Sequence, residues 1–206
     1  MRATLVIPTL NEATSIGPVI RTFRAAAEEA NRTIFRDAPL RWEVLVVDGA
    51  STDGTGALAA AEGARVLVER RRGYGRAYKT GFAAAEGELI ATADGDATYP
   101  VETIPALARK LLDERIDFLS GNRIALLDRR SMTTEHRVGN WVLNGFLKLA
   151  YHRFLKELPG GTLADSQSGF WVFRRELLGR VRLTQDGMAL SEELKIEAVV
   201  RGFRFV

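Results

Sequence analysis

Residues 89–96 read Leu89-Ile90-Ala91-Thr92-Ala93-Asp94-Gly95-Asp96, an apolar run followed by two carboxylates on either side of a glycine. The run predicts a buried strand, and a glycine at its end lets the backbone bend so that both carboxylates reach one ion. Asp94 and Asp96 could then bind Mg²⁺ or Mn²⁺ through oxygen, and such ions keep their other positions for water and phosphates. The same pattern also occurs in turns with a solvated rim. The rest of the chain is needed to choose between a metal site and a turn.

The residues before this stretch alternate between β-rich runs and helical patterns. Strands are expected at residues 4–7, 42–47, 65–68 and 116–119, and another strand is expected to begin at residue 89. Helices are expected at residues 15–29, 55–62, about 76–85 and 101–113. This alternation predicts right-handed crossovers and an α/β fold with a mainly parallel central sheet between two layers of helices. Polar loops follow the strands at one edge of such a sheet, which is where ligands bind.

The residues after position 123 are less regular. A long amphipathic helix is expected at residues 135–155, a break at 158–162, a strand entered from the turn at 165–170, and helices at 174–181 and 191–201. The last four residues resemble the start of a strand. We expect one domain over residues 1–206, with a regular part at 1–123 and a less regular part at 124–206.

Composition narrows the class of protein. Of the 206 residues, 46% are hydrophobic and 27% are charged, which are ordinary globular values. The absence of cysteine excludes disulfides, thiolate metal sites and cysteine nucleophiles. A net charge of +3 suits anionic partners, but basic and acidic residues alternate along most of the chain, so we do not expect a nucleic-acid binder. No apolar stretch approaches the length of a membrane span.

Several polar motifs have both a functional and a plain structural interpretation. Asp48 ends a predicted strand at the ligand edge, whereas Asp53 is suited to cap the following helix. Residues 70–79 contain five basic side chains, which are typical of a solvated surface, yet Gly73 and Gly75 would also let the backbone approach a phosphate. Glu192 and Glu193 could each act as a general base, but they begin a predicted helix, where acids stabilise the dipole without any catalytic role.

Taken together, these motifs resemble family-two glycosyltransferases of the GT-A fold, within the branch of dolichyl- and polyprenyl-phosphate sugar synthases. The matching segments are Ile7-Pro8-Thr9-Leu10-Asn11-Glu12, residues 48–55, residues 73–87, Asp94-Gly95-Asp96, Ser120-Gly121-Asn122-Arg123 and Asp165-Ser166-Gln167-Ser168-Gly169-Phe170. The resemblance implies a Rossmann-like GT-A fold, with a nucleotide-sugar-binding part at residues 1–123 and an acceptor-side part at 124–206. It also implies an inverting, metal-dependent transfer from a nucleotide-diphosphate sugar to a polyprenyl phosphate.

The resemblance assigns expected roles to individual residues. Nucleotide-sugar contacts are expected from Pro8, Leu10, Glu12, Val47, Asp48, Gly49, Asp94, Gly95 and Asp96, metal contacts from Asp94, Asp96 and Thr98, acceptor-phosphate contacts from Arg123 and Arg137, and catalytic roles for Asp96, Arg123 and Asp165. The expected cofactor is Mg²⁺ or Mn²⁺. Peripheral association with the cytoplasmic face of a membrane is also expected.

Three departures from the family pattern leave parts of this assignment open. Many relatives carry two adjacent acids where this chain has Asp48-Gly49, and a tyrosine is common where Leu10 stands. Relatives also usually continue past residue 206, so we expect the natural chain to be longer. The base, the sugar, the acceptor and the oligomeric state stay open. A transferase to the hydroxyl of a phosphorylated small acid or saccharide, and a non-catalytic nucleotide-binding module, are the alternatives.

Overall fold

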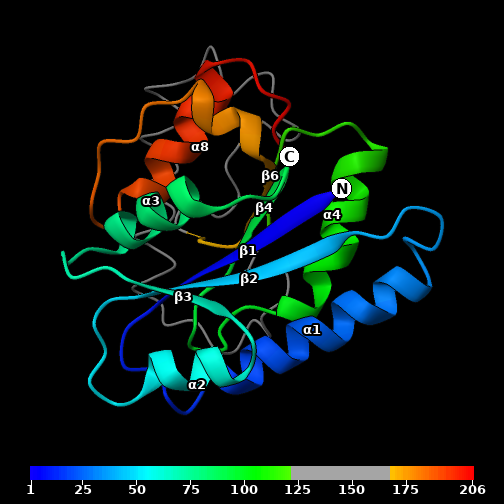
Figure 1. The fold of residues 1–206 in the computed structure, drawn as a ribbon. Helices are drawn as coiled ribbons and strands as arrows, with labels where there is room; N and C mark the ends of the chain where they lie inside the picture. Colours follow the sequence, from blue (N-terminus) through cyan, green and yellow to red (C-terminus); the bar gives the residue numbers. More distant parts are fainter. Residues whose placement is uncertain (122–167) are drawn as a thin grey trace, which may run out of the picture.

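The computed structural model describes residues 1–121 and 168–206, which share one six-stranded sheet (Figure 1). The strands are β1 Arg2–Thr9, β2 Arg41–Asp48, β3 Arg65–Val68, β4 Leu89–Thr92, β5 Phe118–Ser120 and β6 Trp171–Arg174. Their order across the sheet is β3-β2-β1-β4-β6-β5. Strands β3, β2, β1 and β4 pair in parallel, whereas β6 is antiparallel to both β4 and β5.

Helices cover both faces of the sheet, as the strand and helix alternation predicted (Figure 1). The helices are α1 Ile16–Arg32, α2 Thr55–Ala61, α3 Tyr74–Ala84, α4 Ile104–Asp113 and α8 Leu190–Val200, with short 3-10 helices η1 Val101–Thr103 and η3 Arg175–Gly179. Leu5 and Ile7 of β1 pack in one core with α1 and α4, whereas Val6 packs in a second core with α3 and α8. Side chains of a strand alternate between the two faces, so β1 contributes to both cores.

The central strand is almost wholly apolar because both of its faces are covered. Residues 3–9 of β1 are all buried, and its register with β2 runs from Arg2 opposite Arg41 to Thr9 opposite Asp48. Full burial of each large apolar side chain contributes about 1.5–3 kcal/mol. This packing places the ends of β1 and β2 side by side and so fixes the edge where their loops meet.

Within residues 1–121 and 168–206 the predicted elements are present, and most of their ends lie within three residues of the expected positions. The position of β6 was not foreseen, because β6 lies between β4 and β5 although it follows β5 in the chain. Phe173 of β6 pairs with Ile90 on one side and with Phe118 on the other. The expected strand start at the end of the chain corresponds to a parallel bridge between Phe205 and Phe118.

Some predictions fall on residues 122–167, outside the described residues. They are the amphipathic helix at 135–155 and the site residues Arg123, Arg137 and Asp165. The division into parts at 1–123 and 124–206 also stays a prediction. In the part of the chain that the structure describes, no helix has both the length and the apolar character to cross a membrane.

Candidate active site

A cleft of about 420 Å³ lies where β1, β2, β3 and β4 end. Its lining comes from the four loops that follow these strands and from the start of α3. The lining residues are Pro8, Thr9, Leu10, Glu12, Gly49, Glu69, Arg71, Arg72, Gly73, Tyr74, Ala77, Asp94, Gly95 and Asp96. The carboxyl edge of a parallel sheet is the usual ligand site of α/β folds.

A second hollow of about 640 Å³ lies beside the opposite ends of β1 and β2. Three arginines contribute to its lining together with Phe35 and Leu112. Two of these arginines form surface ion pairs, Arg2 with Glu86 and Arg109 with Asp113. This hollow lies at the amino edge of the sheet, and the described residues that line it include no carboxylate pair. We therefore assign the active site to the cleft at the carboxyl edge.

Seven of the nine residues expected to contact the nucleotide sugar line the cleft, and the other two, Val47 and Asp48, do not. Val47 is fully buried in the core beneath α3. Asp48 is also buried, and its Oδ1 accepts a hydrogen bond of 2.9 Å from the backbone N–H of Ser51. A Cβ atom added at Gly56 would lie 2.7 Å from Oδ2 of Asp48. The side chain of Asp48 therefore organises the turn below the cleft.

The two carboxylates of the opening motif are brought to the cleft by a tight turn after β4. Asp94 is half-buried and Asp96 is exposed, while Gly95 between them is buried. A Cβ atom at Gly95 would lie 2.9 Å from Oγ1 of Thr9, so the turn requires glycine. Thr98 is exposed, and its backbone N–H donates a hydrogen bond of 2.9 Å to Oδ1 of Asp96. The turn therefore presents two carboxylates on the rim of one cleft.

The donor set at this rim fits a hard divalent ion. Within residues 1–121 and 168–206, no group of three or more histidine, cysteine, aspartate or glutamate side chains forms a complete metal cage. Asp94 and Asp96 are instead a pair beside an open cleft. Mg²⁺ is typically held by one or two carboxylates and completed by waters and substrate phosphates. Asp94 and Asp96 are the residues that would hold such an ion.

Two tyrosines of α3 contact the buried side of this carboxylate pair. The hydroxyl of Tyr74 donates to Oδ1 of Asp94 at 3.0 Å, and the hydroxyl of Tyr78 lies 3.4 Å from the same oxygen. Burial, followed by the negative charge of Asp94, raises the pKa of Tyr74, and burial also raises the pKa of Tyr78. Both hydroxyls therefore keep their protons near neutral pH and remain hydrogen-bond donors.

The turn before β6 lies against these tyrosines. The carbonyl of Gly169 accepts hydrogen bonds from Thr92 at 2.6 Å and from Tyr78 at 3.3 Å. Its N–H donates to the hydroxyl of Tyr99 at 2.8 Å. The tyrosines were not singled out from the sequence, although their spacing of four residues places them on one helix face.

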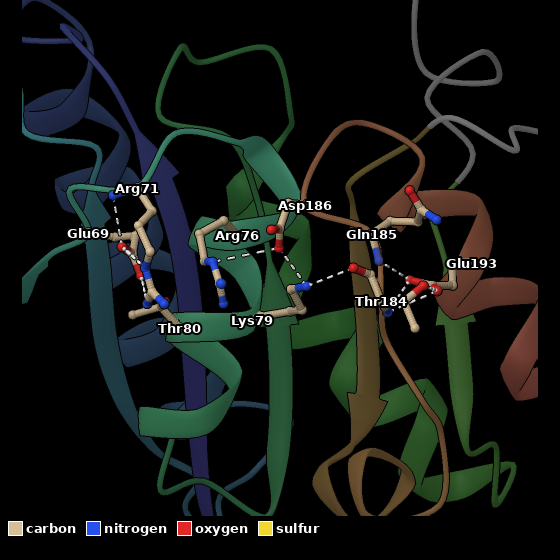
Figure 2. A network of polar contacts seen from close by, with 9 residues as sticks. All are labelled: Glu69, Arg71, Arg76, Lys79, Thr80, Thr184, Gln185, Asp186 and Glu193. Carbon is tan, nitrogen blue, oxygen red and sulfur yellow. Dashed lines mark hydrogen bonds and ion pairs between the residues drawn. The ribbon is translucent and has the colours of Figure 1, made fainter.

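The basic run at residues 70–79 is largely paired within the protein (Figure 2). The buried carboxylate of Glu69 accepts hydrogen bonds from Nε and Nη2 of Arg71 at 2.8 and 2.7 Å and from the hydroxyl of Thr80 at 2.6 Å. These bonds, from Arg71 first and then Thr80, hold the pKa of Glu69 well below its usual range. Arg71 and Arg72 line the cleft, so part of the run does reach the candidate site.

The glycines of this run accommodate protein backbone. Gly73 has φ 133°, and a Cβ atom there would lie 2.2 Å from the carbonyl oxygen of Asp186. A Cβ atom at Gly75 would lie 2.8 Å from the carbonyl oxygens of Gln185 and Gly187. Lys79 and Arg76 lie 2.6 and 3.6 Å from a carboxylate oxygen of Asp186 (Figure 2). The close approach that the sequence suggested for a phosphate is thus made by residues 185–187.

The acids with structural interpretations are engaged in hydrogen bonds. Glu193 accepts from the N–H groups of Thr184 and Gln185 and from the Thr184 hydroxyl, at 2.6–3.0 Å. Burial acts to raise its pKa, but these hydrogen bonds outweigh burial, so the pKa of Glu193 is lowered. Asp53 accepts from the N–H groups of Thr55 and Ala13 at 3.0 Å. Both side chains therefore hold loops at helix starts.

Sequence relatives include two proteins of Haloferax volcanii. A dolichyl-phosphate hexose transferase is 33% identical over 199 residues, which cover 97% of this chain and 77% of that protein. The low-salt glycan biosynthesis hexosyltransferase Agl6 is 33% identical over 196 residues, which cover 94% of this chain and 43% of that protein. The chain thus spans less than half the length of one curated relative and about three quarters of the other.

Solved structures confirm the predicted fold class. Glucosyl-3-phosphoglycerate synthase from Mycobacterium tuberculosis, in complex with Mn²⁺, UDP and glucosyl-3-phosphoglycerate, superposes with a TM-score of 0.68 at 25% identity. The superposition covers 97% of this chain and 65% of that one. The α/β sheet described above is therefore that of a GT-A fold. A family model for glycosyl transferase family 2 matches residues 4–182, and the chain belongs to that family, as its motifs predicted.

Proposed function

We propose that this protein is an inverting glycosyltransferase that moves a sugar from a nucleotide-diphosphate sugar to the phosphate of a polyprenyl lipid. The observation that carries the proposal is the pair Asp94 and Asp96 on the rim of a cleft at the carboxyl edge of the sheet. A dolichyl-phosphate hexose transferase among the relatives supports this acceptor class.

The arrangement of the cleft suggests how the donor would lie in it. Pro8, Leu10, Glu12 and Gly49 line the part formed by the loops after β1 and β2, where base and ribose would bind. Asp94 and Asp96 follow β4, on the other side of β1, where the diphosphate would bind. A bound Mg²⁺ or Mn²⁺ would stabilise the negative charge that develops on the leaving diphosphate.

The acceptor side of the proposal rests on proton chemistry. A phosphate monoester is already largely ionised near neutral pH, so it needs positioning and charge neutralisation, whereas a hydroxyl needs a base to take its proton. Glu193 was one candidate base, and its carboxylate is occupied by Thr184 and Gln185. Two further sets of roles remain proposals from the sequence. Contacts to the acceptor phosphate are proposed for Arg123 and Arg137, and catalytic roles beside Asp96 are proposed for Arg123 and Asp165.

A second candidate is transfer to a hydroxyl of a phosphorylated small acid. The structural similarity to a synthase bound to glucosyl-3-phosphoglycerate favours this alternative. A non-catalytic nucleotide-binding module would bind a nucleoside diphosphate without consuming any sugar donor. Peripheral association with the cytoplasmic face of a membrane belongs to the polyprenyl-phosphate proposal, because its acceptor lies in a membrane.

The test is a screen of nucleotide sugars for release of nucleoside diphosphate, with Mg²⁺ or Mn²⁺ and with either a polyprenyl phosphate or 3-phosphoglycerate as acceptor. We expect release that depends on the metal and on the polyprenyl phosphate. Glu193→Gln should keep kcat within about tenfold, because loss of a general base typically costs about 10²- to 10⁴-fold. Turnover with 3-phosphoglycerate alone would favour the second candidate, and binding without turnover would favour the module.

A further inference from the structure

The hydroxyl of Tyr74 lies at 3.0 Å from Oδ1 of Asp94, directly behind the rim of the cleft. We propose that Tyr74 is a positioning residue that sets the rotation of the Asp94 carboxylate for the metal and diphosphate. This inference rests on the proposed function, because that function supplies the metal and diphosphate for which the Asp94 carboxylate is oriented. It gives the start of α3 a role in orienting a carboxylate that comes from the loop after β4.

Packing leaves the Tyr74 hydroxyl little freedom. Its ring meets the ring of Tyr78 edge to face, with centroids 4.9 Å apart, and the two hydroxyls lie 3.4 Å from each other. Tyr78 is fully buried and is itself packed against Phe82 and Trp171, both with centroids at 5.4 Å. A side chain held by rigid neighbours can orient its hydrogen-bond acceptor at little entropic cost.

The turn before β6 confines the hydroxyl from the other side. A Cβ atom added at Gly169 would lie 2.1 Å from the Tyr74 hydroxyl oxygen and 3.4 Å from Cζ of the same ring. Gly169 is in turn fixed by Thr92 and Tyr99. Only glycine therefore leaves room for the hydroxyl at this place, and the space it leaves is used for the contact with Asp94.

A donor behind a metal-binding carboxylate has a measurable role. Hydrogen bonds to ligating side chains fix their orientation, and their removal typically costs about 10- to 100-fold in metal affinity. Tyr74→Phe removes the hydroxyl and keeps the ring, so packing with Tyr78 is retained. The positioning role can thus be separated from a contribution to the core.

The primary experiment titrates the protein with Mn²⁺, followed by electron paramagnetic resonance, in the presence of UDP and separately of GDP. Tyr74→Phe should weaken Mn²⁺ binding about 10- to 100-fold. Calorimetry of nucleotide binding in EDTA should show affinity within about twofold of the unaltered chain, because base and ribose contacts are not touched. Phe82→Leu is the matched control, since it alters the same aromatic stack without a contact to Asp94 and should leave Mn²⁺ affinity unchanged.

A double-mutant cycle with Gly169, in the turn before β6, tests the same contact of the Tyr74 hydroxyl. Gly169→Ala should displace the Tyr74 hydroxyl and reduce Mn²⁺ affinity to a similar degree. Added to Tyr74→Phe, it should cause little further loss, because both substitutions remove one interaction. Two independent structural defects would instead reduce Mn²⁺ affinity additively.

The outcomes separate this inference from the proposed function. Unchanged Mn²⁺ affinity in Tyr74→Phe, together with its loss in Asp94→Asn, would overturn the role of Tyr74 and leave the metal site standing. Equal losses of Mn²⁺ binding and of nucleotide binding in EDTA would also overturn it, because they indicate general damage. If the unaltered chain showed no metal-dependent nucleotide binding, both the inference and the metal part of the proposed function would be wrong.

Discussion

The two most conspicuous motifs of the chain, Asp94-Gly95-Asp96 and the basic run at residues 70–79, contribute to the same cleft in different ways. The carboxylates lie on the cleft rim after β4. In the basic run, Arg71 is paired with Glu69, and Arg76 and Lys79 are paired with Asp186 (Figure 2). A motif's capacity to bind a ligand therefore depends on the partners that the fold brings to it.

The largest expected effect tests the carboxylate side of this comparison. Asp96→Asn should reduce Mn²⁺-dependent UDP binding by more than about 100-fold, which exceeds the loss typical for residues behind a ligand. The thermal unfolding midpoint should stay unchanged, because Asp96 is exposed. Calorimetry with and without Mn²⁺ measures the binding. The control is Asp113→Asn, whose carboxylate pairs with Arg109 on the surface. Unchanged metal dependence in Asp96→Asn would refute the central assignment.

A second effect tests whether the glycines of the run serve the fold or a ligand. Gly75→Ala places a methyl group 2.8 Å from the carbonyl oxygens of Gln185 and Gly187 and should lower the free energy of unfolding. Overpacking of this kind costs about 1–3 kcal/mol. Urea denaturation measures it. Gly179→Ala is the matched control because, among the described residues, no atom beyond its chain neighbours lies within 4 Å of the added Cβ. Normal stability with weakened nucleotide binding would show instead that Gly75 serves the ligand.

The smallest effect concerns the pH dependence of the Glu69 contacts. Because the pKa of Glu69 is lowered in the folded state by Arg71 and Thr80, its contribution to stability is fully present above its unfolded-state value, about 4.3. That contribution is lost as the pH falls below this value. The thermal unfolding midpoint, measured by calorimetry, should therefore fall less steeply in Glu69→Gln than in the unaltered chain as the pH is lowered from about 5. Equal slopes would show that the pair adds nothing to the fold.

Local pattern determined the positions of the helices and strands and the polar character of one sheet edge. The prediction of β4 followed by two acids depended only on neighbouring residues, because strand ends and turns are set by local backbone chemistry. The family of the chain was also predicted correctly from motif order. The strand ends and turns are encoded within a few residues of each other, whereas the family is carried by the order of such segments along the chain.

Tertiary structure alone decided which side chains are available at the cleft. The glycines at 73 and 75 met residues 185–187, and Tyr74 came to face Asp94 across 20 positions of sequence. The insertion of β6 between β4 and β5 was likewise invisible in the order of the chain. Such contacts join distant segments through packing and hydrogen-bond pairing, and periodicity within one segment carries no information about the partner it will meet.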